Sequence, residues 1–201
     1  MSTIDRSGGV RAKLHATVLA PLVLALALAL AACVSVPEGY TPVPRAEAPL
    51  FDPFTFFAGS SRGEGTLKTA MSDPVPVRVE SRGRIVVERL RESSWDAPPR
   101  RVLVIDQTIR EGEKPPRTRQ WRIEEIAPNR YAGTLSDAIG PVRGRATGNL
   151  LVLEYTMKGS LPVRQELTLS AGGTRVDNLM TVKQLGVTVA VLTEDIRKHG
   201  S

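Results

Sequence analysis

Cysteine and histidine, the residues most often used for metal binding and nucleophilic catalysis, are almost absent from this chain of 201 residues. It contains one Cys and two His. One Cys excludes an intrachain disulfide framework, and this pool of ligands excludes a zinc site built from Cys and His. A Ser-His-Asp triad would have to use His199, third from the end, and no Gly-x-x-x-x-Gly-Lys phosphate loop occurs. We therefore predict no enzymatic activity and no cofactor.

Aromatic residues make up only 4% of the chain, and they are not interleaved with a basic stripe. Proteins that bind single-stranded nucleic acid stack bases on aromatic side chains along a basic groove. The composition therefore predicts no nucleic-acid partner.

The N-terminus has the layout of an export signal. Residues 1–15 are basic, and residues 16–32 are uncharged and rich in Leu, Ala and Val. This run is short for a membrane-spanning helix and contains Pro21, so it predicts a cleaved signal peptide over residues 1–32. The only Cys, Cys33, directly follows Ala31 and Ala32, as in the lipobox of bacterial lipoproteins. We predict lipidation at Cys33; an ordinary signal peptide is the alternative.

A lipidated Cys33 would anchor the chain to a membrane of the bacterial envelope, facing the periplasm. Residue 34 is Val, whereas Asp at this position marks retention in the inner membrane of enteric bacteria, so the outer membrane is favoured. Loss of Asp5, Arg6, Arg11 and Lys13 with the signal lowers the net charge from +6 to +4. This modest excess, mostly Arg, favours anionic lipid headgroups.

The next two segments are a tether and a short helix that precede the rest of the folded domain. Residues 33–50 contain four Pro and predict a semi-extended tether after the lipidated Cys. All four Phe lie in residues 51–57, where Asp52 is suited to N-cap a short helix that begins at Pro53. We expect this helix to close one end of a core; a gate over a ligand cavity is the alternative. Residues 51–198 then form a single domain.

The remainder alternates between apolar and polar residues and is interrupted by turn signals such as Arg82-Gly83 and Gly140-Pro141. This pattern predicts an all-β, antiparallel up-and-down β-barrel of about ten strands, like lipocalins or fatty-acid-binding proteins, with a short N-terminal helix. A two-sheet sandwich is the alternative. The expected strands are Arg62–Met71, Val75–Ser81, Arg84–Arg91, Arg101–Arg110, Arg117–Ile126, Arg130–Ser136, Val142–Ala146, Asn149–Lys158, Val163–Leu169, Thr174–Val182 and Val187–Ile196.

Arginines on the strand that contains Trp121 are candidate ligand-binding residues. Arg117, Arg119 and Trp121 share one strand face, and Tyr131 and Tyr155 offer hydroxyl groups. In small fatty-acid-binding barrels, Arg and Tyr hold a carboxylate by paired hydrogen bonds. Alternatively, Arg117 and Arg119 lie in water beyond the barrel rim.

Three further polar residues are candidates for ligand contact: Asp137, Asn149 and Asn178. Each also suits a local role. Asp137 fits a cap in the turn before Gly140-Pro141, and the two Asn fit turns or backbone hydrogen bonds.

Several short motifs are spread along the folded part of the chain: Phe56-Phe57-Ala58-Gly59, Gly63-Glu64-Gly65, Trp121-Arg122-Ile123, Gly133, Asp137, Gly140, Gly144, Gly148-Asn149, Tyr155, Asn178, Met180, Lys183 and Leu185-Gly186-Val187. Together they resemble a family of bacterial lipoproteins that contain a domain of unknown function, family 3833. The resemblance covers about residues 51–198, with Leu185 where the family usually has Phe. It implies an exported lipoprotein with a lipocalin-like or fatty-acid-binding-like barrel, and it carries no catalytic residue.

Two functions fit these observations. The first is a lipid-anchored binding protein whose barrel holds a hydrophobic ligand such as a fatty acid or lipid. The second is a structural or adaptor lipoprotein with a filled core and a protein partner on its surface. The pattern indicates no particular oligomeric state.

Overall fold

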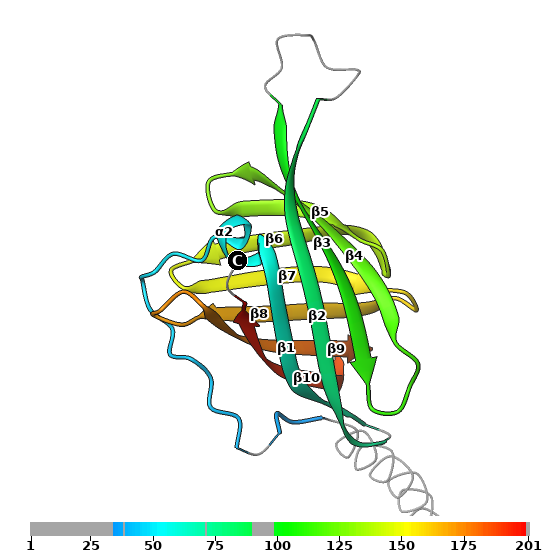
Figure 1. Cartoon of the computed structure of the whole chain (residues 1–201). Coiled ribbons are helices and arrows are strands. Elements are labelled where there is room, and N and C mark those ends of the chain that lie inside the picture. Colours follow the sequence, from blue (N-terminus) through cyan, green and yellow to red (C-terminus); the bar gives the residue numbers. More distant parts are fainter. Residues whose placement is uncertain (1–33, 38, 71, 90–98, 200–201) are drawn as a thin grey trace, which may run out of the picture. The chain divides into compact units, whose positions relative to one another are not determined.

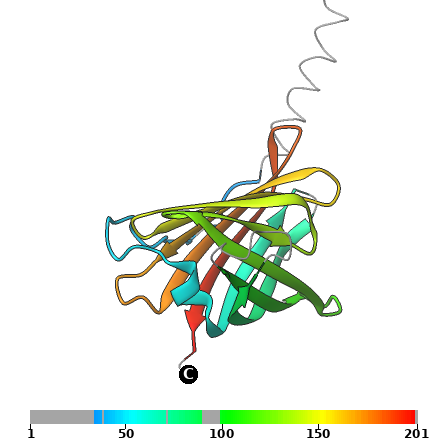
Figure 2. The same ribbon diagram turned by 90° about the horizontal axis from the view of Figure 1, so that it is seen from above.

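The computed structural model describes residues 34–37, 39–70, 72–89 and 99–199. Within these residues the chain forms a closed barrel of antiparallel strands and one short helix (Figure 1). The strands follow one another around the wall in sequence order, and the last pairs with the first (Figure 2). The elements are α2 (Pro53–Phe57), β1 (Gly59–Thr69), β2 (Ser72–Glu88), β3 (Arg100–Glu111), β4 (Arg117–Ala127), β5 (Arg130–Leu135), β6 (Ala138–Thr147), β7 (Leu150–Met157), β8 (Leu161–Leu169), β9 (Arg175–Gln184) and β10 (Val187–Lys198).

The up-and-down barrel predicted from the alternation is confirmed, and the sandwich alternative does not apply. Because β10 pairs with β1 from Ser61–Lys198 to Thr69–Ala190, the sheet has no open edge. Residues that alternate along each strand therefore face either the barrel interior or its outer surface.

Two strands that the sequence predicted as separate belong to the single strand β2. Arg82-Gly83 does not form the turn predicted between Val75–Ser81 and Arg84–Arg91, because β2 runs through it from Ser72 to Glu88. A Cβ atom at Gly83 would lie 1.8 Å from the carbonyl oxygen of Phe57. Gly83 thus allows the end of α2 to pass directly over the strand, and it does not reverse the chain.

The predicted turn at Gly140-Pro141 is also wrong. Both residues belong to β6, and the chain reverses earlier, at Ser136 and Asp137. The pairing of β6 with β7 shifts between Ile139 and Arg143, where Gly140 has a φ of 74°. This is a β-bulge, which needs the left-handed conformation that Gly adopts without strain.

Helix α2 closes one end of the barrel, as expected from its sequence. The carboxylate of Asp52 accepts hydrogen bonds from the backbone N–H groups of Phe54 (2.9 Å) and Thr55 (3.2 Å), and Pro53 occupies the first turn. All four Phe side chains are buried in the core, and we call them the Phe plug: Phe51, Phe54, Phe56 and Phe57. Apolar residues from most strands pack around this plug and fill the adjoining half of the barrel, including Leu103, Leu151, Leu167 and Val176.

The segment between residue 34 and the plug lies against the barrel wall. Its described residues, 34–37 and 39–50, form no helix or strand, yet several of their backbone and side-chain groups bind the strands and turns beside them. Its contacts in chain order are Val34 N to Thr188 O (3.0 Å), Val43 N to Asp177 Oδ2 (2.5 Å), Arg45 Nη2 to Glu166 Oε2 (2.6 Å), Ala46 N to Asn149 Oδ1 (2.7 Å) and Phe51 N to Gly148 O (2.8 Å).

The predicted signal peptide (residues 1–32) and the predicted lipidation site Cys33 lie outside the described residues, so both stay predictions. Among the residues that are described, no helix has the length and apolar character to cross a bilayer.

Candidate functional site

Polar side chains cross the middle of the barrel interior, directly above the core around the Phe plug. Along β3, for example, Leu103 and Ile105 pack in the core, Gln107 follows, and apolar Ile109 comes next. Corresponding residues on the other strands complete what we call the interior polar belt: Ser81, Gln107, Arg119, Trp121, Tyr155, Gln165, Asn178 and Glu194.

Gln107 organises one side of the belt. Its Oε1 accepts hydrogen bonds from Arg119 Nε and from Trp121 Nε1, both at 2.7 Å, and its Nε2 donates to Ser81 Oγ at 2.9 Å. The guanidinium of Arg119 also lies over the indole ring of Trp121, 5.3 Å from its centroid. Arg119 is therefore fixed in place by a neutral amide and an aromatic face.

No carboxylate of the described residues lies within ion-pair distance of Arg119. A half-buried guanidinium without an ion-pair partner favours the binding of an anion. An anionic ligand group would form charge-assisted hydrogen bonds with the N–H groups that Gln107 does not use.

Tyr155 connects the two sides of the belt. Its ring meets that of Trp121 edge to face at 5.4 Å, and its hydroxyl lies 3.3 Å from Gln165 Oε1 and 3.7 Å from Met180 Sδ. Burial raises the pKa of Tyr155 to about 12, although the charge of Arg119 opposes this rise. Tyr155 is therefore a neutral hydrogen-bond donor at any physiological pH.

Glu194 is a buried carboxyl group on the opposite side of the belt. Asn178 Nδ2 donates a hydrogen bond to its Oε2 at 2.8 Å. Burial raises the pKa of Glu194, while the hydrogen bond from Asn178 and the charge of Arg119 lower it less strongly. Burial therefore extends the protonated form of Glu194 above the pH range of an ordinary glutamate.

Two glycines of β1 make room for Glu194. A Cβ atom at Gly63 would lie 1.8 Å from Glu194 Oε1, and one at Gly65 would lie 2.1 Å from the carbonyl oxygen of Thr193. The Gly63-Glu64-Gly65 motif therefore has a physical explanation: it lets β10 project a long polar side chain into the barrel.

Apolar side chains continue the interior on the side of the belt away from the Phe plug. Val77, Val79, Ile109 and Leu192 form this second cluster, with Leu67 and Met180 packed against it. We call this end of the barrel, which carries the β3–β4 and β9–β10 turns, the distal end. An interior lined first by apolar groups and then by the polar belt suits an amphiphile that enters with its polar head first.

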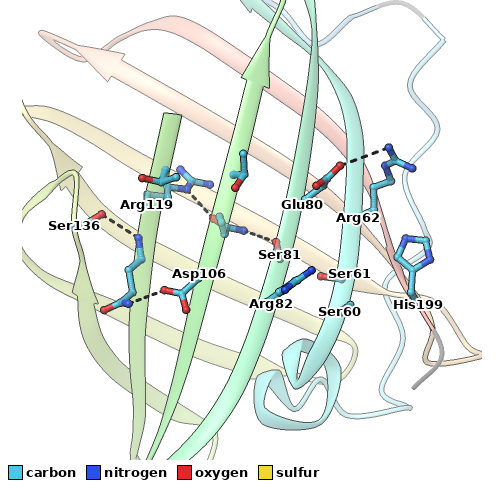
Figure 3. Close-up of a pocket in the computed structure, with 14 residues that line it drawn as sticks. Ser60, Ser61, Arg62, Glu80, Ser81, Arg82, Asp106, Arg119, Ser136 and His199 are labelled. Carbon is cyan, nitrogen blue, oxygen red and sulfur yellow. Dashed lines mark hydrogen bonds and ion pairs between the residues drawn. The ribbon is translucent and has the colours of Figure 1, made fainter. Parts of the chain in front are cut away.

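A groove of about 980 Å³ crosses strands β1 to β4 (Figure 3). Its lining contains both inward and outward residues: Ser81, Gln107 and Arg119 belong to the belt, and Asp106 lies on the outer row. Arg119, Ser81 and Asp106 are labelled in Figure 3. Gln107 joins Arg119 to Ser81 by hydrogen bonds, and Gln120 donates a hydrogen bond to Asp106.

The structure gathers four of the predicted site residues in or beside the belt: Arg119, Trp121, Tyr155 and Asn178. Arg117, two residues further along β4, lies at the rim and pairs with Asp137 at 3.0 Å. Asp137 sits in the β5–β6 turn, and among the described residues its side chain makes no turn-capping hydrogen bond.

Tyr131 and Asn149 lie near the Phe plug, away from the belt. The ring centroid of Tyr131 is 6.5 Å from that of Phe54, and burial raises the pKa of Tyr131 to about 12. The side chain of Asn149 binds Pro44 O, Ala46 N and Leu169 O, so its hydrogen bonds serve the backbone.

Four belt residues are absent from the sequence-based prediction: Ser81, Gln107, Gln165 and Glu194. Each is in phase with apolar inward residues of its own strand, for example Glu194 with Leu192 and Ile196. A polar residue in an otherwise apolar inward row was the signal that would have found them.

Residues 59–63, Gly-Ser-Ser-Arg-Gly, have the Gly-x-Ser-x-Gly spacing of a nucleophile elbow. The elbow requires a turn between a strand and a helix. Ser61 instead lies within β1, 5% exposed, and its hydroxyl has no hydrogen-bond partner among the described residues. His199 approaches this run through a backbone hydrogen bond to Ser60 O. This arrangement does not form a catalytic triad.

A family model described as "Protein of unknown function (DUF3833)" matches residues 27–198. The chain belongs to this family. Five residues of the motifs named above converge on the interior polar belt, although they come from four different strands: Gly63, Gly65, Trp121, Tyr155 and Asn178.

One solved structure is similar to this DUF3833 protein. It is an S-type phycobiliprotein lyase, CPES from Guillardia theta, with a TM-score of 0.56 and 11% sequence identity over 74% of this chain and 91% of the lyase. At this identity the likeness shows a shared lipocalin-like barrel fold and nothing of the activity. A search of curated proteins found no match.

Proposed function

We propose that this protein is a non-catalytic, lipid-anchored binding protein of the bacterial envelope, and that its barrel holds a fatty acid or a similar amphiphile. The ligand's carboxylate binds Arg119, and its acyl chain extends along the second apolar cluster toward the distal end. The anchor is the lipidated Cys33, which places the barrel in the periplasm, at the outer membrane in preference to the inner one.

The observation that carries the proposal is the state of Arg119. Its side chain is fixed inside the barrel by Gln107 and Trp121, and no described carboxylate lies within ion-pair distance. A carboxylate ligand supplies the missing charge and accepts paired hydrogen bonds from the guanidinium, with Tyr155 as a neighbouring neutral donor.

The apolar residues beyond the belt support the second half of the proposal. Val77, Val79 and Ile109 face the interior between Arg119 and the distal end. The core around the Phe plug fills the other half of the barrel, so the ligand occupies only the distal half. This filled half is also the observation that favours the second candidate, an adaptor lipoprotein with a packed core.

Binding of oleic acid and oleyl alcohol to the purified, detergent-solubilised protein tests the proposal, with Trp fluorescence as the readout. The two ligands differ only in the headgroup, so the wild type binds the acid more tightly. Replacement Arg119→Gln removes a charged hydrogen-bond donor and weakens oleic acid binding by about 10- to 150-fold, with little effect on the alcohol.

Arg117→Gln is the matched control, because Arg117 is on the same strand but pairs with Asp137 at the rim. It retains wild-type affinity. If Arg119→Gln binds oleic acid as tightly as the wild type, the proposed site is wrong. If native mass spectrometry and titration both reveal no hydrophobic ligand, the adaptor function replaces it.

The mass of the purified protein tests the anchor separately. We expect a chain that begins at Cys33 and carries added acyl mass. In the Cys33→Ala variant, we expect neither cleavage nor acylation. If residues 1–32 were still attached to the wild-type protein, lipidation would be contradicted. The proposed binding site inside the barrel would not be affected by that result.

A further inference from the structure

Three arginines form an unusual group on the outer surface of the barrel, away from the interior site. Arg130 on β5 and Arg145 on β6 are direct cross-strand partners, and Arg143 lies on the same outward row of β6. All three are exposed. We call Arg130, Arg143 and Arg145 the arginine patch.

The patch is electrostatically unfavourable by itself. Like charges directly opposite each other on antiparallel strands destabilise the sheet. Among the described residues no carboxylate lies within ion-pair distance of any of the three. Glu154 is directly opposite Arg143 in the pairing of β6 with β7, but its carboxylate binds Arg164 at 2.5 Å.

The surface beside the patch is hollowed and partly apolar. A groove of about 250 Å³ is lined by Arg143, Arg145 and Arg164 and by the half-buried Leu150 and Val152. A second groove, of about 400 Å³, shares Arg143, Glu154 and Arg164 with the first.

Exposed apolar residues border the second groove. Ile139, beside the bulge of β6, is 52% exposed, and Pro141 is also exposed. Lys183 of β9 lines the same groove and adds a further positive charge. Cationic groups therefore surround a strip of aliphatic surface on the outer face of β5 to β9.

We propose that this face binds the phosphate-containing headgroups of an anionic phospholipid surface. Guanidinium groups bind phosphate through two parallel hydrogen bonds, and the repulsion within the patch is relieved when an anion lies between them. The aliphatic strip contacts the glycerol and upper acyl region, as in proteins that lie on a membrane interface. Bound in this way, the barrel lies with its side against the bilayer, and the interior site is not involved.

Titration of the purified full-length protein in neutral detergent with dihexanoylphosphatidylglycerol tests the proposal by calorimetry. The controls are dihexanoylphosphatidylcholine, which has no net charge, and inorganic phosphate. We expect binding of phosphatidylglycerol that weakens as salt rises, and at least tenfold weaker binding of the two controls. Equal affinity for inorganic phosphate, or no binding of phosphatidylglycerol, overturns the proposal.

A triple variant tests the assignment to these residues. Arg130→Gln, Arg143→Gln and Arg145→Gln together lower phosphatidylglycerol affinity at least tenfold. The melting temperature stays equal or rises, because like-charge repulsion is removed. The matched control carries Arg62→Gln, Arg78→Gln and Arg197→Gln, three outward arginines that each have a carboxylate within 4 Å.

The control variant loses the same net charge and retains wild-type affinity. If both triple variants lose affinity equally, binding follows net charge and the patch is not the site. If the patch variant binds as the wild type does, the proposal is wrong even where the protein binds phosphatidylglycerol.

Discussion

Asn149 fastens the segment before the barrel to the barrel wall, and its replacement measures what this connection contributes to stability. The buried side chain accepts a hydrogen bond from Ala46 N and donates to Pro44 O and Leu169 O. Asn149→Ala removes all three bonds, each of which contributes about 1 kcal/mol. Water reaches the exposed Pro44 and Ala46 but not the buried Leu169, so we expect a net loss of about 2 kcal/mol.

For a domain of this size, such a loss lowers the melting temperature by about 4–8 °C. Thermal unfolding followed by circular dichroism measures it. Asn149→Asp keeps the acceptor for Ala46 N but places a carboxylate oxygen against the carbonyl oxygens of Pro44 and Leu169. We therefore expect it to destabilise the protein at least as much as Asn149→Ala does. Asn129→Gly is the control, because Asn129 occupies a turn at φ 61° that Gly also adopts. A melting temperature of Asn149→Ala within 1 °C of the wild type would refute the reasoning, which assumes about 1 kcal/mol per bond.

Three other predictions follow from the barrel and its ends. Gly83→Ala places a Cβ atom against the carbonyl oxygen of Phe57, so we expect a loss of about 1–3 kcal/mol in urea unfolding; wild-type stability would mean that α2 moves freely. Because the folded pKa of Glu194 is raised, its contribution to stability is present below its ordinary value of 4.5 and is lost as pH rises through the raised pKa. We therefore expect the melting temperature of Glu194→Gln to exceed that of the wild type by a margin that grows as pH rises. A margin that shrinks as pH rises would contradict the conclusion that burial raises the pKa of Glu194. An ultraviolet titration should show Tyr131 and Tyr155 ionising near pH 12, with one such group lost in Tyr155→Phe; a single transition at pH 10 would mean that neither ring is buried as described.

The barrel was predictable because its signals are local. Alternating apolar residues such as Leu151, Leu153 and Tyr155 along β7 indicate a strand with one buried and one solvent-exposed face. This signal does not depend on residues distant in the sequence. The two wrong turns arose because Gly has more than one use. At Gly83 it admits the backbone of Phe57, and at Gly140 it forms a bulge, and both uses depend on partners distant in the sequence or across a strand pair.

The candidate site was only half predictable for a related reason. Arg119 and Trp121 share a strand face, so their proximity followed from a period of two. Gln107 and Glu194 lie on other strands. The apolar residues in phase with them indicate that they turn inward, but not that they meet Arg119 and Asn178.

The sequence by itself determined the strand pattern, the short helix capped by Asp52, and which face of each strand turns inward, because these depend on residues a few positions apart. The tertiary structure decided which inward polar residues meet and that the side chain of Asn149 binds three backbone groups. It also decided that Arg130 and Arg145 face each other with no carboxylate of the described residues within ion-pair distance. Strand register sets these relations, and register comes from closing the whole barrel around a common core.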